Sequence, residues 1–144
     1  MNRRAWTVAS LIPCICMIAI IGVSVFLGGC DKLIECTTAD VPMRCHWAYK
    51  GTAVLGALGL VASACTAFAK GKEARRLLAA CTLATAAATA FCLTSAGIGI
   101  CPGGMECQGN APIVWGLSAV SALASAVQMV KADPEQAELP KLGI

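Results

Sequence analysis

Residues 5–27 read AWTVASLIPCICMIAIIGVSVFL, and this stretch contains no Asp, Glu, Lys, Arg or His. Three more uncharged stretches follow at residues 51–69, 77–100 and 111–130. A helix needs about 20 apolar residues to cross a hydrocarbon core of roughly 30 Å, and each stretch meets that length. We therefore predict an all-α membrane protein, a four-transmembrane-helix bundle formed by residues 1–130. Residues 131–144 are predicted to be a short tail with no domain of its own.

The composition of the whole chain supports this class. Hydrophobic residues make up 58% of the sequence and charged residues 13%, whereas ordinary soluble domains contain roughly 25% charged residues. A soluble protein of 144 residues could not bury this much apolar surface, but a protein surrounded by lipid does not need to. The competing interpretation, a buried helical core in a soluble protein, also fails to account for four evenly spaced stretches of this length.

The orientation in the membrane follows from the distribution of basic residues, because Lys and Arg concentrate in cytoplasmic segments. One side of the predicted topology carries Arg3, Arg4, Lys70, Lys72, Arg75, Arg76 and Lys131. The other side carries Lys32, Arg44 and Lys50. We predict that both termini and the 70–76 turn are cytoplasmic and that residues 28–50 and 101–110 are external. The net charge of +3 reflects this topology and gives no support for nucleic-acid binding.

Small residues recur every four positions in three of the predicted helices, which allows helix backbones to approach closely in lipid. The members are Gly59, Ser63 and Ala67, then Ala80, Ala84, Ala88, Cys92 and Ala96, and then Ser118, Ala122 and Ala126. Two interpretations remain open. Either all the stripes pack inside a tight four-helix bundle, or one stripe is left over for a partner subunit.

The chain has ten cysteines, and they form two groups. Those at positions 14, 16, 65, 81 and 92 lie in predicted helices, where a free cysteine behaves as a small hydrophobic residue. The two predicted external segments hold the other five cysteines, and these segments share a pattern. Cys36 is followed by Met43-Arg44-Cys45, and Cys101 is followed by Met105-Glu106-Cys107. The repeat suggests two pseudo-repeated helical hairpins.

Three chemical interpretations of these external segments compete. External thiols face an oxidising compartment, so Cys36, Cys45, Cys101 and Cys107 are disulfide candidates, with connectivity left open. A thiol-redox enzyme with a DsbB-like architecture is the second interpretation, although the Cys-x-x-Cys typical of such enzymes is absent. The third is a soft-metal or haem site. Its candidate ligands are Met43, Cys45, His46, Met105 and Cys107.

Residues 27–30, Leu-Gly-Gly-Cys, resemble a lipobox. With Arg3 and Arg4 as the positive region and an apolar stretch after them, the first helix would be a cleaved signal and Cys30 would carry lipid. The length of that apolar stretch instead favours a retained membrane span. Both outcomes remain open at this point.

Two motifs carry a family resemblance. Met43-Arg44-Cys45-His46-Trp47 before a Gly-rich helix, and Ile98-Gly99-Ile100-Cys101 with Met105-Glu106-Cys107 before the last helix, resemble the DUF4418 family of small prokaryotic integral membrane proteins of unknown function. The resemblance covers about residues 10–130, although Gln108 replaces an expected basic residue and residues 30–41 do not align. It implies the plasma membrane of a prokaryote. It also implies an accessory role beside an ABC transporter permease, because members are often encoded near such transporters.

The sequence contains few residues or motifs that are suited to catalysis. It has one histidine and no phosphate-binding glycine motif. The predicted spans contain no Asp, Glu, Lys, Arg or His, whereas pumps and ion pathways usually carry such a residue in the membrane. We therefore expect a non-enzymatic accessory or structural subunit with the lipid bilayer and a membrane protein as partners. The alternative is a protein that performs thiol or metal chemistry at its external face.

Overall fold

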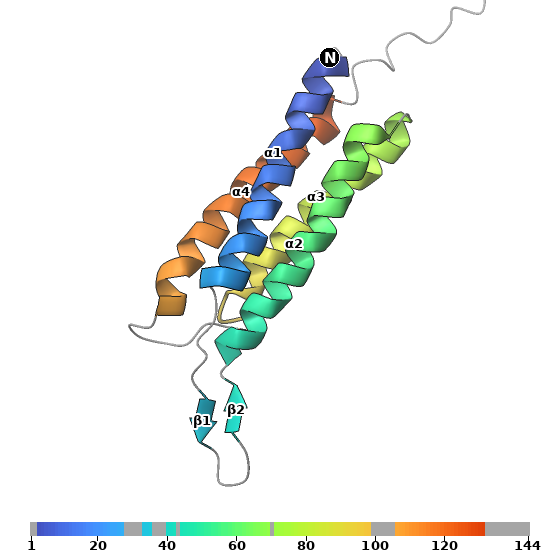
Figure 1. Cartoon of the computed structure of the whole chain (residues 1–144). Coiled ribbons are helices and arrows are strands. Elements are labelled where there is room, and N and C mark those ends of the chain that lie inside the picture. Colours follow the sequence, from blue (N-terminus) through green and yellow to red (C-terminus); the bar gives the residue numbers. More distant parts are fainter. Residues whose placement is uncertain are drawn as a thin grey trace, which may run out of the picture.

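A computed structural model of the chain describes residues 3–27, 33–35, 40–42, 44–69, 71–98 and 106–131. Four helices run alternately up and down beside one another (Figure 1): α1 (Arg3–Gly22), α2 (Arg44–Phe68), α3 (Lys72–Cys92) and α4 (Glu106–Lys131). Helix α2 packs against α1 and α3, and α4 packs against the same two helices. The helices therefore form a ring of four, in which α1 and α3 occupy opposite corners.

Three of the four helices are long and apolar enough to cross a membrane. The candidate spans are Ala9–Leu27, Arg44–Phe68 and Gln108–Val130. Helix α3 is not among them, because it opens with Lys72, Glu73, Arg75 and Arg76 and continues mainly with Ala and Thr. The sequence predicted four spans, and the structure supports a helical membrane protein with three helices of spanning character.

The observed helix ends differ from the limits of the uncharged stretches. Helices α2 and α4 begin several residues earlier, because their first turns are polar and extend the helix beyond its apolar part. Helix α3 runs over residues 72–92 where the sequence suggested 77–100. It stops because the Thr94 N–H and hydroxyl both donate to the Phe91 carbonyl, at 2.9 and 2.7 Å. Gly97 also contacts this carbonyl, and a side chain there would overlap it.

Two short features that the sequence did not predict lie between α1 and α2. Helix α1 continues into a π-helical turn, η1 (Val23–Leu27). The strands β1 (Leu33–Glu35) and β2 (Asp40–Pro42) then form an antiparallel pair in which Ile34 lies opposite Val41. This hairpin projects beyond the end of the bundle (Figure 1).

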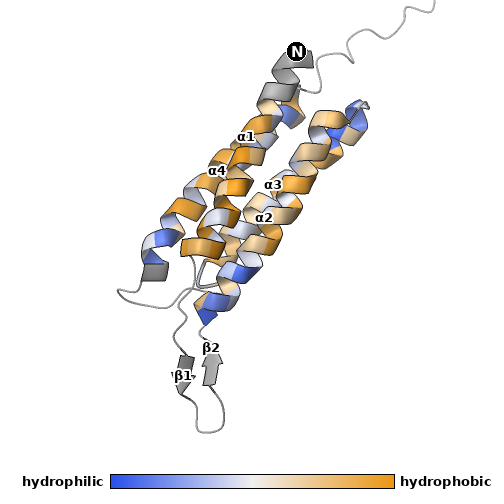
Figure 2. Ribbon diagram, viewed as in Figure 1, coloured by the Kyte–Doolittle hydropathy of each residue, from blue (hydrophilic) through white to orange (hydrophobic). Residues whose placement is uncertain are grey.

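The bundle is apolar outside and partly polar inside, which is the reverse of a soluble protein. Large apolar side chains such as Ile15, Leu58 and Leu123 are more than half exposed, whereas Thr52, Thr89 and other hydroxyl residues are buried. Hydrophobic residues form a belt around the middle of the helices, and hydrophilic residues gather at both ends (Figure 2). This distribution fits a helical bundle surrounded by lipid.

Each helix has a series of buried positions that recurs alternately at three and four residues, the heptad spacing of antiparallel bundles. Cys16 and Ala48 are also buried, each beside a member of its series. Along α1 and η1 the series is Ser10, Pro13, Met17, Ile20 and Ser24, and along α3 and its C-cap it is Ala79, Thr82, Ala86, Thr89 and Leu93. In α2 they are Cys45, Tyr49, Thr52, Gly56, Gly59, Ser63 and Thr66, and in α4 they are Ala111, Val114, Ser118, Ser121, Ser125 and Gln128. The α1 and α3 series have identical spacing when Ser10 is matched with Ala79. The α2 and α4 series have identical spacing when Thr66 is matched with Gln128. The hairpins α1–α2 and α3–α4 thus share one pattern of buried positions.

Candidate functional site

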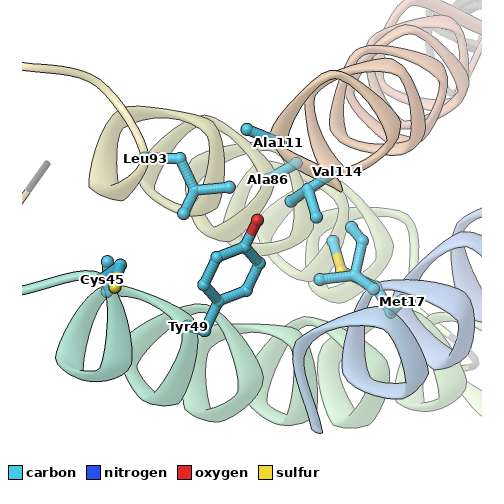
Figure 3. Close-up of a cluster of buried hydrophobic side chains, with 9 residues drawn as sticks. Met17, Cys45, Tyr49, Ala86, Leu93, Ala111 and Val114 are labelled. Atoms are coloured by element: carbon cyan, nitrogen blue, oxygen red, sulfur yellow. The ribbon is translucent and has the colours of Figure 1, made fainter. Parts of the chain in front are cut away.

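An apolar cluster built around Tyr49 packs together side chains from all four helices. This side chain comes from α2, is 1% exposed, and points across the bundle toward α3 and α4 (Figure 3). It packs in one cluster with Met17, Leu93 and Val114. Cys45 lies one helical turn before Tyr49 and is fully buried in the same cluster. The sequence placed Cys45 in an external loop, and the structure instead places it in the first turn of α2.

The neighbouring His46 lies on a different side of α2 from Cys45. It is only half-buried, and its ring meets the Trp47 ring edge-on with centroids 5.8 Å apart. The ammonium group of Lys50 lies 5.3 Å from the centroid of the Trp47 ring, a cation–π contact. An aromatic residue with a basic neighbour is typical of a membrane interface, so this group fits the polar end of a membrane helix.

Most of the external residues that the sequence singled out lie outside the described part of the chain. These are Cys30, Cys36, Met43, Cys101 and Met105. Cys107 belongs to the first turn of α4, but its side chain is also outside the described set. Within the described residues, no group of three His, Cys, Asp or Glu side chains could hold a metal ion. The predicted disulfides, the lipidation at Cys30 and the soft-metal or haem site all stay predictions.

The described cysteines of the helices lie either between packed helices or on the outside of the bundle. The thiol of Cys14 lies 3.1 Å from the Ser63 hydroxyl across the α1–α2 contact, Cys16 is buried, and Cys65 and Cys81 are exposed. No disulfide joins two of the cysteines whose side chains are described.

The predicted packing stripes divide between the inside and the outside of the bundle. Buried members are Gly59, Ser63 and Ser118; half-buried members are Ala67, Ala80, Ala88, Cys92, Ala122 and Ala126; exposed members are Ala84 and Ala96. Ala96 also lies beyond the end of α3. The stripe predicted along residues 80–96 is therefore not the buried side of α3, because the buried positions follow three-and-four spacing and not a strict repeat of four.

Gly59 is a point of close approach in the α1–α2 hairpin. A Cβ at this position would lie 2.8 Å from Met17 Cε and 2.8 Å from Thr85 Oγ1. Both distances are too short for a real side chain, so α1 and α3 can pack against α2 at this level only because residue 59 is glycine. This is the arrangement that small residues permit at membrane helix interfaces.

A polar contact that the sequence analysis missed joins α1 to α4. Pro13 lies inside α1 and has no N–H, so the Ala9 carbonyl loses its usual helical donor. The side chain of Gln128 in α4 donates to this carbonyl through Nε2 at 2.7 Å, and it is 3% exposed. Two features of the sequence could have indicated this contact: a proline within one apolar stretch and a glutamine within another. In lipid an unpaired backbone carbonyl is costly, so Gln128 stabilises the helix that Pro13 interrupts.

The outer face of α3 differs from the outer faces of the other helices. Exposed large apolar residues occur along the length of α1, α2 and α4, whereas in α3 they are limited to Leu77 and Phe91 near its two ends. Between them the exposed positions are Cys81, Ala84 and Ala87. The equivalent exposed positions of α1 in the shared heptad pattern are Ile12, Ile15 and Ile18. The outer face of α3 is thus built from small side chains.

A lipid-facing exterior, spanning-length helices and a tightly packed interior of small and hydroxyl residues define a helical integral membrane protein. A family model described as "Domain of unknown function (DUF4418)" matches residues 11–131, and the chain belongs to this family. No curated protein and no solved structure matches the chain. The family resemblance drawn from the two Met-x-Cys motifs is confirmed. The structure adds that helices α2 and α4 begin at the middle residue of each motif, Arg44 and Glu106.

Proposed function

We propose that the chain is a non-enzymatic accessory subunit of a membrane complex, and that it binds its partner through the outer face of α3. The observation that carries the proposal is the contrast between Ala84 on this face and Ile15 at the equivalent position of α1, both exposed. A small outer face lets the backbone of a second membrane helix approach closely, and close van der Waals packing replaces the missing hydrophobic drive in lipid.

We propose that all four helices cross the plasma membrane of a prokaryote, with both termini in the cytoplasm. Although α3 is less apolar than the others, it packs between α2 and α4 and runs parallel to the bundle axis (Figure 1). The start of α1, the α2–α3 turn and the end of α4 lie at the same end of the bundle. The basic residues Lys72, Arg75 and Arg76 are at this end, which supports its cytoplasmic assignment.

Tags on the two termini of the full chain test the four-span topology. A green fluorescent protein at either terminus is expected to fluoresce and an alkaline phosphatase at the C-terminus is expected to be inactive, since both ends face the cytoplasm. If α3 lay on the membrane surface, the chain would have three spans and the termini would report opposite sides.

The partner that we propose is a transmembrane helix of an ABC transporter permease, as the family resemblance implies. When the tagged chain is extracted gently from its native membranes, a permease is expected to co-purify. The variant Ala84→Ile, which gives α3 the side chain found on α1, should lose most of this partner. The matched control Ile15→Ala should keep it. Purification of the wild-type chain alone, as a stable monomer, would contradict the proposal.

We also propose that disulfides among Cys36, Cys45, Cys101 and Cys107 hold the external segments together. The support is chemical, because these segments would face an oxidising compartment in the proposed topology. Intact mass after denaturing alkylation, with and without reductant, tests it. Four extra alkyl groups after reduction are expected. Full alkylation without reductant would show that the proposed disulfides are absent. It would favour the alternative, which is thiol or soft-metal chemistry at the external face.

A further inference from the structure

Two buried hydroxyl groups at the middle of α4 are the only described buried side-chain N or O atoms without a hydrogen-bond partner. They belong to Ser118 and Ser121, which are 2% and 0% exposed. Ser125, one turn further along the same helix, donates to the Ser121 carbonyl at 2.9 Å. Buried polar groups in native proteins are almost always hydrogen-bonded, so the two partnerless hydroxyls need an explanation.

The register of the bundle fixes the level of these two serines. Gln128 bonds to Ala9 and Asn110 bonds to Leu27, at 2.7 and 2.6 Å, so α4 is antiparallel to α1 with Ser118 and Ser121 opposite the middle of α1. Trp115 donates to the Ala90 carbonyl at 3.2 Å, which places the two serines near Ala86 of α3. They therefore lie at mid-bundle, far from both polar ends.

The equivalent level of the first hairpin shows what is different here. In the heptad pattern, Gly59 of α2 corresponds to Ser121 of α4, and Met17 of α1 corresponds to Ala86 of α3. Met17 fills the space over Gly59, with its Sδ 2.9 Å from where a Cβ would lie. In the second hairpin the equivalent positions hold two short side chains, Ser121 and Ala86. Figure 3 shows the long Met17 and the short Ala86 in the same cluster.

We infer that Ser118 and Ser121 bind ordered water inside the bundle, between α4 and Ala86 of α3. A buried water forms two to four hydrogen bonds and requires a site that is both polar and roomy enough. The two hydroxyls, one helical turn apart, provide the polar groups, and the Ser–Ala pair provides the room that the Gly–Met pair of the first hairpin does not. This water site does not depend on the proposed docking role of α3.

Water-edited solid-state NMR of the full chain in lipid bilayers tests the inference directly. The signals of Ser118 and Ser121 are expected to receive magnetisation from water several-fold faster than those of Val114 and Ser125. Val114 is the apolar control on the same face, and Ser125 is a serine whose hydroxyl is already bonded. Transfer to Ser118 and Ser121 no faster than to Val114 would overturn the inference.

A space-filling variant provides the second readout. Ala86→Met places in α3 the residue that α1 carries at the equivalent position, and its side chain is expected to displace the water. The fast transfer at Ser121 should then be lost. The midpoint temperature of unfolding should stay near that of the wild type. A folded Ala86→Met protein that keeps the fast transfer would overturn the assignment to this place. A large fall in midpoint temperature would do the same, because it would mean that the space is already full.

Discussion

The two hairpins of the bundle share one pattern of buried positions but differ in the sizes of the side chains that occupy it. In α1–α2 the long Met17 packs on Gly59, and α1 presents isoleucines to its surroundings. In α3–α4 the equivalent positions hold the short Ala86 and Ser121, and α3 presents Ala84 and its small neighbours. The same framework therefore carries side chains of different size at these equivalent positions, and α3 is the helix whose outer face is small between Leu77 and Phe91.

The difference is the basis of the docking role proposed for α3. A helix whose outer face needs only to meet lipid can carry large apolar residues at no cost, as α1 does with Ile15 and Ile18. Small residues on an outer face bury less area against lipid but let another helix approach closely. The proposal that α3 packs on both of its sides accounts for this contrast between α1 and α3.

The largest expected effect comes from making the first hairpin resemble the second. Gly59→Ser brings a Cβ into Met17 and Thr85, and overpacking of this kind costs roughly 1–3 kcal/mol. Adding Met17→Ala should recover part of the loss, with a coupling of about 0.5–3 kcal/mol between the two sites. Unfolding in a detergent titration measures both values.

Gly116→Ser is the matched control, because a Cβ at Gly116 meets nothing within 4 Å. If Gly59→Ser destabilised the protein no more than Gly116→Ser, the close approach of α1 and α3 at Gly59 would be wrong. An equal loss with and without Met17→Ala would mean that the methionine does not fill the space over Gly59.

The second effect concerns the contact by which α4 supports α1. Gln128→Leu leaves the buried Ala9 carbonyl without a donor, and such a loss costs about 1–3 kcal/mol. In a Pro13→Ala background the backbone N–H of residue 13 can donate to Ala9 again, so the same substitution should cost much less. A double-mutant cycle on unfolding free energies compares the two. Identical losses in both backgrounds would show that Gln128 acts independently of Pro13.

The smallest expected effect is on the stability of the isolated chain when the outer faces are exchanged. Ala84→Ile and Ile15→Ala each change an exposed side chain, and substitutions of this kind usually stay within about 0.5 kcal/mol. The unfolding free energy in detergent checks this. A loss above about 1 kcal/mol for Ala84→Ile would indicate that Ala84 packs within the chain and would weaken the docking proposal.

The sequence predicted the class of protein and the number of helices from its uncharged stretches alone, because the hydrocarbon core sets a minimum length that local composition reveals. It also linked the two external segments through their Met-x-Cys motifs. The side of α3 that is buried could not be predicted, since alanines occupy most of its faces and several periodicities fit. Likewise the bond from Gln128 to Ala9 depends on the register of two helices far apart in sequence, which local patterns do not specify.

The docking role of α3 is tested most directly by site-specific photocrosslinking in native membranes. A benzophenone amino acid at position 84 is expected to yield one discrete higher-mass adduct that contains a second membrane protein, and mass spectrometry would identify its crosslinked helix. The same amino acid at position 15, the equivalent exposed site of α1, should yield no discrete protein adduct. Equal, diffuse labelling of lipid from both positions would contradict the account, because it would mean that the small face of α3 meets only the bilayer.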